Sequence, residues 1–205
     1  MTFVTAELDL VVAGMITVAE QANRKQFNKE RDLAKQVQQQ LAAAGVVFDF
    51  LKDAGKTAWT GGIETMGDLY QLSRLAVYLE KNVNISGVLS DGPVLPEKID
   101  PRIMTIWSGK AKTRFPHLVF LKSINSYYLP VDFAAPLWLP FKNAENKLEE
   151  AFFGSSVHLE QELLALQPML DQTQVPADAS ARRCLDMLLA GARTSQATDL
   201  LLIVW

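Results

Sequence analysis

The sequence has few of the residues on which covalent cross-links and metal sites depend. Its 205 residues include one cysteine, Cys184, and two histidines, His117 and His158. A single thiol cannot form an internal disulfide, which favours a reducing compartment, and we expect a cytoplasmic protein. The three residues are far apart in the sequence and match no metal-ligand spacing, so the sequence predicts no metal and no cofactor.

The chain also lacks an excess of basic residues and a long hydrophobic run. Its formal net charge is −3 and its pI is about 5.4. Without a basic surface to bind a phosphate backbone, we expect no nucleic acid among its partners. The most apolar candidate for a targeting segment, residues 8–19, is shorter than a membrane-spanning helix of about 20 residues. Glu7 and Asp9 stand where a signal peptide would carry Lys or Arg, so we expect no membrane contact.

The composition that remains is typical of a globular protein. Hydrophobic residues make up 49% of the chain and charged residues 21%. These values predict a single globular domain over residues 1–205. The glycines and prolines of residues 82–102 predict a connecting loop, which is the best candidate for an internal boundary.

Periodic apolar residues predict several helices. One long helix or two consecutive ones are expected within residues 5–53, where proline is absent and a narrow apolar stripe recurs. A second helix is expected over residues 66–81. Residues 144–171 predict a helical region broken at 154–156, where Ser155 or Ser156 can cap the second part. A last helix is expected from Asp178 or Ser180 to about Arg193, and the apolar residues 199–205 predict a buried strand.

Aromatic and β-branched residues predict a hairpin in the middle of the chain. Its strands are expected within residues 116–121 and 126–133, with a turn at 122–125. Pro130 has no amide donor, so the second strand should lie at a sheet edge or break there. The expected fold class is therefore α+β, mainly α: a helical domain with a small antiparallel sheet or hairpin.

The common catalytic motifs are incomplete or absent in this sequence. Gly55-Lys56-Thr57 resembles the end of a phosphate-binding loop, but Phe50 occupies the position of the required first glycine, and Gly55 is better interpreted as a helix stop. No Gly-x-Ser-x-Gly motif is present. A catalytic pair of Cys184 with one of the two histidines stays open as a hypothesis, although the sequence favours an inert, buried thiol. Most acidic residues are expected on solvated helix faces, and Asp132 is the one best suited to burial or function.

The hairpin is also the site of an unusual density of aromatic residues. Because alternate residues of a strand face opposite ways, Tyr127 and Tyr128 cannot both enter one core. One of them is expected to be exposed, and tyrosine and tryptophan are favoured anchors at protein interfaces. The alternative, that these aromatics fill a core with a tyrosine hydroxyl at the surface, is equally consistent with the sequence.

The segment from Phe115 to Phe133, FPHLVFLKSINSYYLPVDF, resembles a bacterial family with a PHL…YYxPVDF motif. The helix around LYQLSRLA and the helix after Gly154-Ser-Ser are similar to it as well, so the resemblance covers about half of the chain. Such proteins resemble the cytoplasmic immunity proteins of toxin systems, which neutralise a cognate toxin by binding it. The turn around Ser123 departs from the family's His-, Ser-, Asp- and Gly-rich pattern, so any chemistry of that turn is absent here.

The sequence therefore predicts a binding or inhibitory protein without enzymatic activity, most concretely an immunity protein that contacts a toxin. Its predicted partner-binding residues are Tyr127, Tyr128, Asp132 and Trp138, with Glu149 and Glu150 steering a basic partner. Two alternatives stay open. One is a small hydrolase or transferase with a pocket near His117 and Asp132, and the other is a helical adaptor or structural subunit that uses the N-terminal helix. The oligomeric state is not determined by the sequence.

Overall fold

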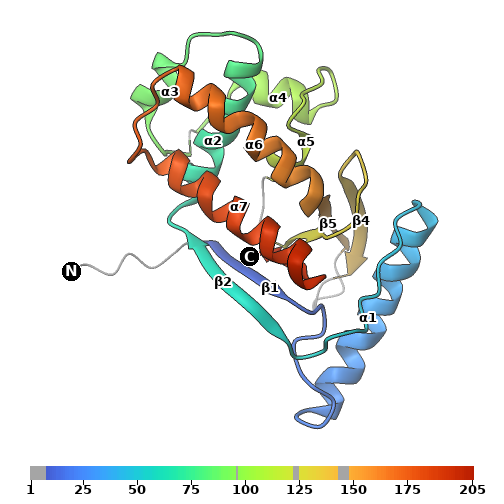
Figure 1. The fold of residues 1–205 in the computed structure, drawn as a ribbon. Helices are drawn as coiled ribbons and strands as arrows, with labels where there is room; N and C mark the ends of the chain where they lie inside the picture. Colours follow the sequence, from blue (N-terminus) through green and yellow to red (C-terminus); the bar gives the residue numbers. More distant parts are fainter. Residues whose placement is uncertain (1–7, 96, 122–124, 143–147) are drawn as a thin grey trace.

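Six strands form one mixed sheet in the order β2-β1-β6-β3-β5-β4 (Figure 1). The structure is a computed structural model that describes residues 8–95, 97–121, 125–142 and 148–205. All neighbouring strands are antiparallel except β3 and β5, which are parallel. The strands are β1 (Leu8–Ala13), β2 (Thr57–Ile63), β3 (Ser126–Leu129), β4 (Leu137–Lys142), β5 (Leu148–Ser155) and β6 (Leu201–Val204).

This sheet shows that the expected fold class is wrong. The described residues form an α/β fold with a substantial sheet, and not a helical domain with a small hairpin. The helices are α1 (Arg24–Ala43), α2 (Met66–Glu80), α3 (Ser86–Asp91), α4 (Pro101–Trp107), α5 (Pro116–Val119), α6 (Ser156–Gln172) and α7 (Ser180–Thr198).

Helices cover both faces of the sheet, and each face buries its own apolar cluster. On one face, side chains such as Leu10, Tyr128 and Leu202 pack against α2, α6 and α7. On the other face, Phe153 and Ile203 pack against α1 and the segment that follows it. Figure 1 shows α1 apart from the layer of α6 and α7, consistent with this division. Adjacent residues of one strand enter different clusters because side chains alternate along a strand.

The predicted helix over residues 5–53 is wrong at its start. Leu8, Leu10 and Val12 alternate into one core as strand β1, so the period there is two and not that of a helix. The helix α1 begins only at Arg24, where the Asn23 side chain accepts a hydrogen bond from the Gln26 amide at 3.1 Å. Gly55, expected to stop a helix, lies in a turn with φ of 74° that leads into β2.

The predicted hairpin is wrong as well. Pro116–Val119 forms the short helix α5, and β3 pairs with β5 and β6 instead. Strand β3 ends at Leu129, directly before Pro130, so the expected break at this proline is confirmed. The predicted turn falls partly on residues 122–124, which lie outside the described residues. Local propensity could not identify partners that come from distant parts of the chain.

The later helices agree better with the sequence. Helix α2 is confirmed, α7 begins at the predicted Ser180, and β6 is the predicted buried terminal strand. Ser155 caps α6, since its hydroxyl accepts a hydrogen bond from the His158 amide at 3.2 Å. Residues 148–155 form β5 where a helix was predicted, and residues 144–147 of that prediction lie outside the described residues. The predicted loop of 82–102 contains α3 and the first residues of α4.

Replacing Gly154 with alanine should destabilise the sheet. Gly154 lies opposite Tyr128, and a Cβ atom there would lie 2.5 Å from the tyrosine ring carbons. We expect the free energy of unfolding in urea to fall by about 1–3 kcal/mol, because Tyr128 is fully buried and cannot move aside.

Gly87→Ala is the matched control. It lies in α3, and a Cβ atom there would meet nothing within 4 Å. This variant should be neutral or stabilised by up to about 1 kcal/mol, because alanine favours helix more than glycine does. Equal effects of the two substitutions would contradict the packing described.

Candidate functional site

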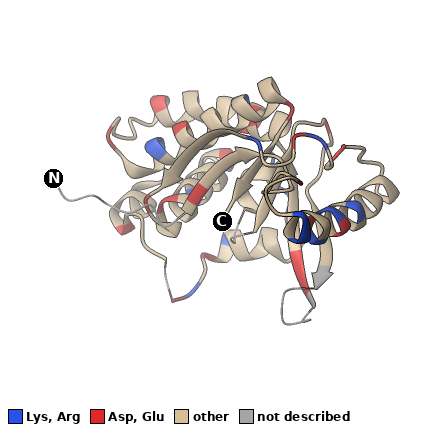
Figure 2. Ribbon diagram, turned by 90° about the horizontal axis from the view of Figure 1, so that it is seen from below, with Lys and Arg blue, Asp and Glu red and all other residues tan. Residues whose placement is uncertain are grey.

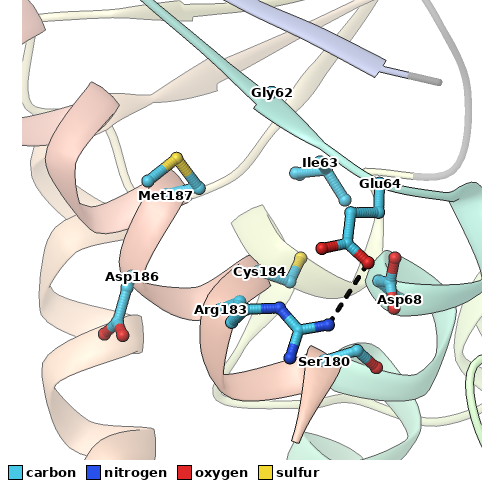
Figure 3. A pocket seen from close by; sticks show the side chains of 9 residues that line it. All are labelled: Gly62, Ile63, Glu64, Asp68, Ser180, Arg183, Cys184, Asp186 and Met187. Atoms are coloured by element: carbon cyan, nitrogen blue, oxygen red, sulfur yellow. Dashed lines mark hydrogen bonds and ion pairs between the residues drawn. The ribbon is translucent and has the colours of Figure 1, made fainter. Parts of the chain in front are cut away.

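A cavity of about 300 Å³ opens where the end of β2, the start of α2 and the N-terminal half of α7 meet (Figure 3). We call it the α7 pocket. Its volume is at the lower end of the range for small ligand sites. Three of its residues are acidic and one is basic. It is lined by Gly62, Ile63, Glu64, Asp68, Ser180, Arg183, Cys184, Asp186 and Met187.

Asp68 is held in the α7 pocket by the capping of α2. The Thr65 hydroxyl accepts a hydrogen bond from the Asp68 amide at 3.2 Å, and Asp68 Oδ2 accepts one from the Thr65 amide at 2.8 Å. This reciprocal capping box fixes the first turn of α2. Asp68 as a residue is only 3% exposed, and its carboxylate lies at the helix N-terminus, where the helix dipole favours a negative charge.

The other charged groups of the α7 pocket are more exposed. An Arg183 guanidinium nitrogen lies 3.2 Å from Glu64 Oε2, and another donates to the Asp178 carbonyl at 2.6 Å. Asp186 is exposed on the next turn of α7 and has no ion pair with any residue that the structure describes. With one cation among three carboxylates, the pocket is acidic and would repel an anionic ligand.

Cys184 lines the α7 pocket but is not suited to nucleophilic chemistry. The thiol is 2% exposed, and burial, followed by the nearby Asp68 carboxylate, raises the pKa of Cys184 above its ordinary value of 9.0. Because the thiolate is the nucleophile, a raised pKa keeps the group protonated and inert. The predicted buried thiol is confirmed.

A second arrangement of polar groups joins α5 to α6. Glu162 accepts hydrogen bonds from the amides of His117 and Leu118, at 3.0 and 2.9 Å, and lies 2.9 Å from His117 Nδ1. The His158 ring stacks on the His117 ring, with centroids 5.2 Å apart, and His158 Nε2 lies 2.8 Å from Asp132 Oδ1. Asp132 therefore pairs with His158, and His117 pairs with Glu162.

This arrangement does not have the geometry of a metal site, and the predicted pocket near His117 and Asp132 stays a prediction. The two imidazole planes are within 14° of parallel, so their nitrogens do not converge on one point as ligands of a metal would. No cluster of three or more potential metal ligands occurs among the described residues. A cavity of about 320 Å³ lies nearby, but it is lined by His158 and Glu162 and not by His117 or Asp132.

The two predicted tyrosine anchors lie on opposite faces of the sheet. Tyr128 is fully buried and its hydroxyl donates to the His117 carbonyl at 2.7 Å. Tyr127 is partly buried on the α1 side, where its ring stacks on Phe153. Burial raises the pKa of both tyrosines.

The structure does not bring the other predicted binding residues to one surface. Trp138 packs edge-to-face against Phe152 on the side of α6 and α7. Asp132, expected to be buried or functionally placed, has a side chain that is 78% exposed and so is not buried. Glu149 and Glu150 are exposed on β5. Whether any of these residues contacts a partner stays a prediction.

Sequence reasoning missed the residues of the α7 pocket. The spacing of Thr65 and Asp68 was a readable capping signal, but it indicates only where α2 begins. Glu64, Arg183 and Asp186 carry no motif, and they meet because β2 and α7 pack together in the fold.

Charge is divided unevenly between α1 and the rest of the chain. Helix α1 carries five basic and two acidic residues, a net charge of +3, so the remaining residues carry −6 within the overall −3. Figure 2 shows the basic residues of α1 grouped along this one helix. The α7 pocket lies on the other side of the sheet from α1, in the part of the chain with the acidic excess.

A family model described as "Putative DNA-mimic protein" matches residues 6–204, nearly the whole chain. The chain belongs to this DNA-mimic family. No curated protein and no solved structure matches it.

Membership in the DNA-mimic family corrects one prediction and supports another in part. The prediction of no nucleic acid among the partners conflicts with a DNA-mimic role and is corrected, because the DNA-mimic family points to a partner that binds DNA. A protein-binding role agrees with the family, whereas toxin immunity has no support from it. No helix among the described residues is long and apolar enough to cross a membrane.

The state of Cys184 can be tested by thiol labelling. Because the pKa of Cys184 is raised and the side chain is buried, Ellman's reagent should react with the native chain far more slowly than with the urea-unfolded chain. Absorbance of the released thiolate at pH 8 gives both rates. Equal rates would show that the α7 pocket exposes a reactive thiol, contrary to the structure.

Proposed function

We propose that this protein binds a DNA-binding protein by presenting carboxylates where duplex DNA would present phosphates. The observation that carries the proposal is the family match over residues 6–204. The distribution of charge supports it, because the chain outside α1 has a net charge of −6.

The proposed mimicry is local. A net charge of −3 over 205 residues is small beside duplex DNA, which carries one charge per about 1.7 Å of its axis. The whole surface therefore cannot imitate a polyanion, and a defined face must do so. The surface around the α7 pocket fits best. Glu64 and Asp186 line the pocket, Asp178 is bonded through its carbonyl to Arg183, and the carboxylates of Asp178 and Asp186 have no basic partner among the described residues.

The proposed role differs from toxin immunity in the partner it requires. Both roles need direct protein contact and no catalysis. A DNA mimic, however, must cover the partner's own DNA-binding surface, so DNA and this protein should exclude each other. An immunity protein has no such requirement unless its toxin binds DNA.

Affinity purification from the native host tests the proposal. The tagged full chain is incubated with nuclease-treated lysate, with and without excess duplex DNA. We expect one stoichiometric partner that binds duplex DNA on its own and that the added DNA displaces. A partner that does not bind DNA, or one that DNA does not displace, would overturn the proposal, as would recovery of the chain alone.

Charge-neutralising variants locate the contact. Asp178→Asn combined with Asp186→Asn should weaken binding to the captured partner on the order of tenfold, because two carboxylates of the proposed face are lost. Glu97→Gln combined with Asp49→Asn removes the same charge from exposed positions outside the α7 pocket and should leave the affinity unchanged. Equal losses would mean that only the overall charge matters.

Salt should distinguish the mimic from DNA. A protein with 6–10 phosphate contacts loses about 10³–10⁵ in DNA affinity between 50 and 200 mM salt, because condensed counterions are released. This chain has too few carboxylates to condense counterions in that way, so the partner's affinity for it should fall much less steeply. Binding isotherms at several salt concentrations measure both slopes. A slope as steep as that for DNA would contradict a local contact.

A further inference from the structure

The α7 pocket combines an acidic rim with an apolar floor. Glu64 and Asp68 stand on the same side of it, and Asp186 lies further along α7 (Figure 3). Ile63, Met187 and the protonated Cys184 provide apolar surface. A ligand that suits these walls has an aliphatic stem and a cationic end.

Two buried polar groups in the α7 pocket have hydrogen-bonding capacity that the described chain does not use. Asp68 is 3% exposed, and the hydrogen bonds that its side chain accepts from Thr65 all involve Oδ2, which leaves Oδ1 without a donor from any described residue. The Cys184 thiol, 2% exposed, also has no hydrogen bond within the described parts of the chain. Oδ1 is not among the fully buried side-chain atoms that lack a partner in the described chain, so it is accessible from the pocket, where an external donor can reach it.

Arg183 shows which cation the rim accepts. Its guanidinium lies at the mouth of the α7 pocket, where one nitrogen pairs with Glu64 at 3.2 Å and another donates to the Asp178 carbonyl at 2.6 Å. The side chains of Arg183 and Glu64 are 51% and 50% exposed. The contact is therefore at the surface, where an ion pair is weak and an incoming guanidinium can replace it.

We propose that the α7 pocket binds an arginine side chain of the partner, with the guanidinium donating to Glu64 and Asp68 and the methylenes against Ile63 and Met187. That the arginine belongs to a partner protein rests on the proposed function. The preference of the pocket for a guanidinium group does not depend on that function. In the complex this arginine contacts carboxylates as it would contact a phosphate of DNA.

The geometry favours arginine over lysine. A guanidinium presents five donors in a planar fork and can bond two carboxylates at once, whereas an ammonium is a compact point charge that is more strongly hydrated. The volume of about 300 Å³ accommodates one such side chain. Phosphate groups are excluded by the three carboxylates of the lining.

The proposal can be tested on the isolated full chain with N-acetyl-arginine amide as the probe. We expect saturable shifts in the ¹H–¹⁵N spectrum at Gly62, Ile63 and Ser180, with a dissociation constant on the order of 1 mM for a ligand of this size. The matched neutral probe, N-acetyl-citrulline amide, should cause no saturable shift. No saturation with the arginine probe, or equal binding of both probes, would overturn the proposal.

Three variants identify the groups involved. Glu64→Gln should weaken binding of the arginine probe by at least about threefold, because one charged acceptor is lost. Arg183→Gln should strengthen it by a similar factor, since the internal competitor and its positive charge are removed. Glu97→Gln, an equivalent change at an exposed position outside the pocket, should have no effect. Glu64 and Arg183 are half-exposed, and unchanged thermal unfolding midpoints would verify that each variant folds.

The Glu97→Gln control separates a specific site from general charge, because general attraction of a cation would give Glu64→Gln and Arg183→Gln the same opposite effects. If both variants weakened probe binding, or if Glu97→Gln did so equally, the assigned site would be wrong. The test is also independent of the proposed function. Absence of probe binding together with DNA-displaceable capture of a partner would reject only the pocket, and probe binding without such a partner would reject only the DNA-mimic role.

Discussion

The fold depends on the pairing of the last strand, β6, with two strands from distant parts of the sequence. Strand β6 pairs with β1 on one side and with β3 on the other, both antiparallel. All four of its side chains are buried: Leu202 and Val204 in one cluster, Leu201 and Ile203 in the other. Without β6 the sheet would divide into a two-stranded and a three-stranded part, and neither apolar cluster would be continuous.

The same pairing positions the α7 pocket. Helix α7 is joined to β6 by Asp199 and Leu200, and the Ser195 hydroxyl donates to the Leu200 carbonyl at 2.6 Å. Asp199 adopts a left-handed conformation with φ of 55°, which aspartate tolerates better than most residues. The chain can thus reverse and lay α7 over β1 and β2, next to the start of α2. The basic helix α1 packs on the opposite face, so it lies on the other side of the sheet from the α7 pocket.

The sequence predicted the elements that have strong local signals. These elements are the helical period of α2, the start of α7 at Ser180, the cap at Ser155 and the apolar terminal strand. The sheet could not be predicted, because β3 pairs with strands about 25 and 75 residues away along the chain, and such pairing leaves no local pattern. The α7 pocket could not be predicted for the same reason. Its carboxylates are ordinary in sequence and become a site only when β2, α2 and α7 meet.

Hydrogen–deuterium exchange on the complex with the captured partner tests the central claim most directly, because it maps the contact on both proteins. The account predicts slower exchange in this chain over residues 62–68 and 178–187. It also predicts that the partner's protected amides coincide with those that duplex DNA protects. Protection confined to α1 in this chain, or protection of a surface that DNA does not touch in the partner, would contradict mimicry of DNA by the acidic face around the α7 pocket.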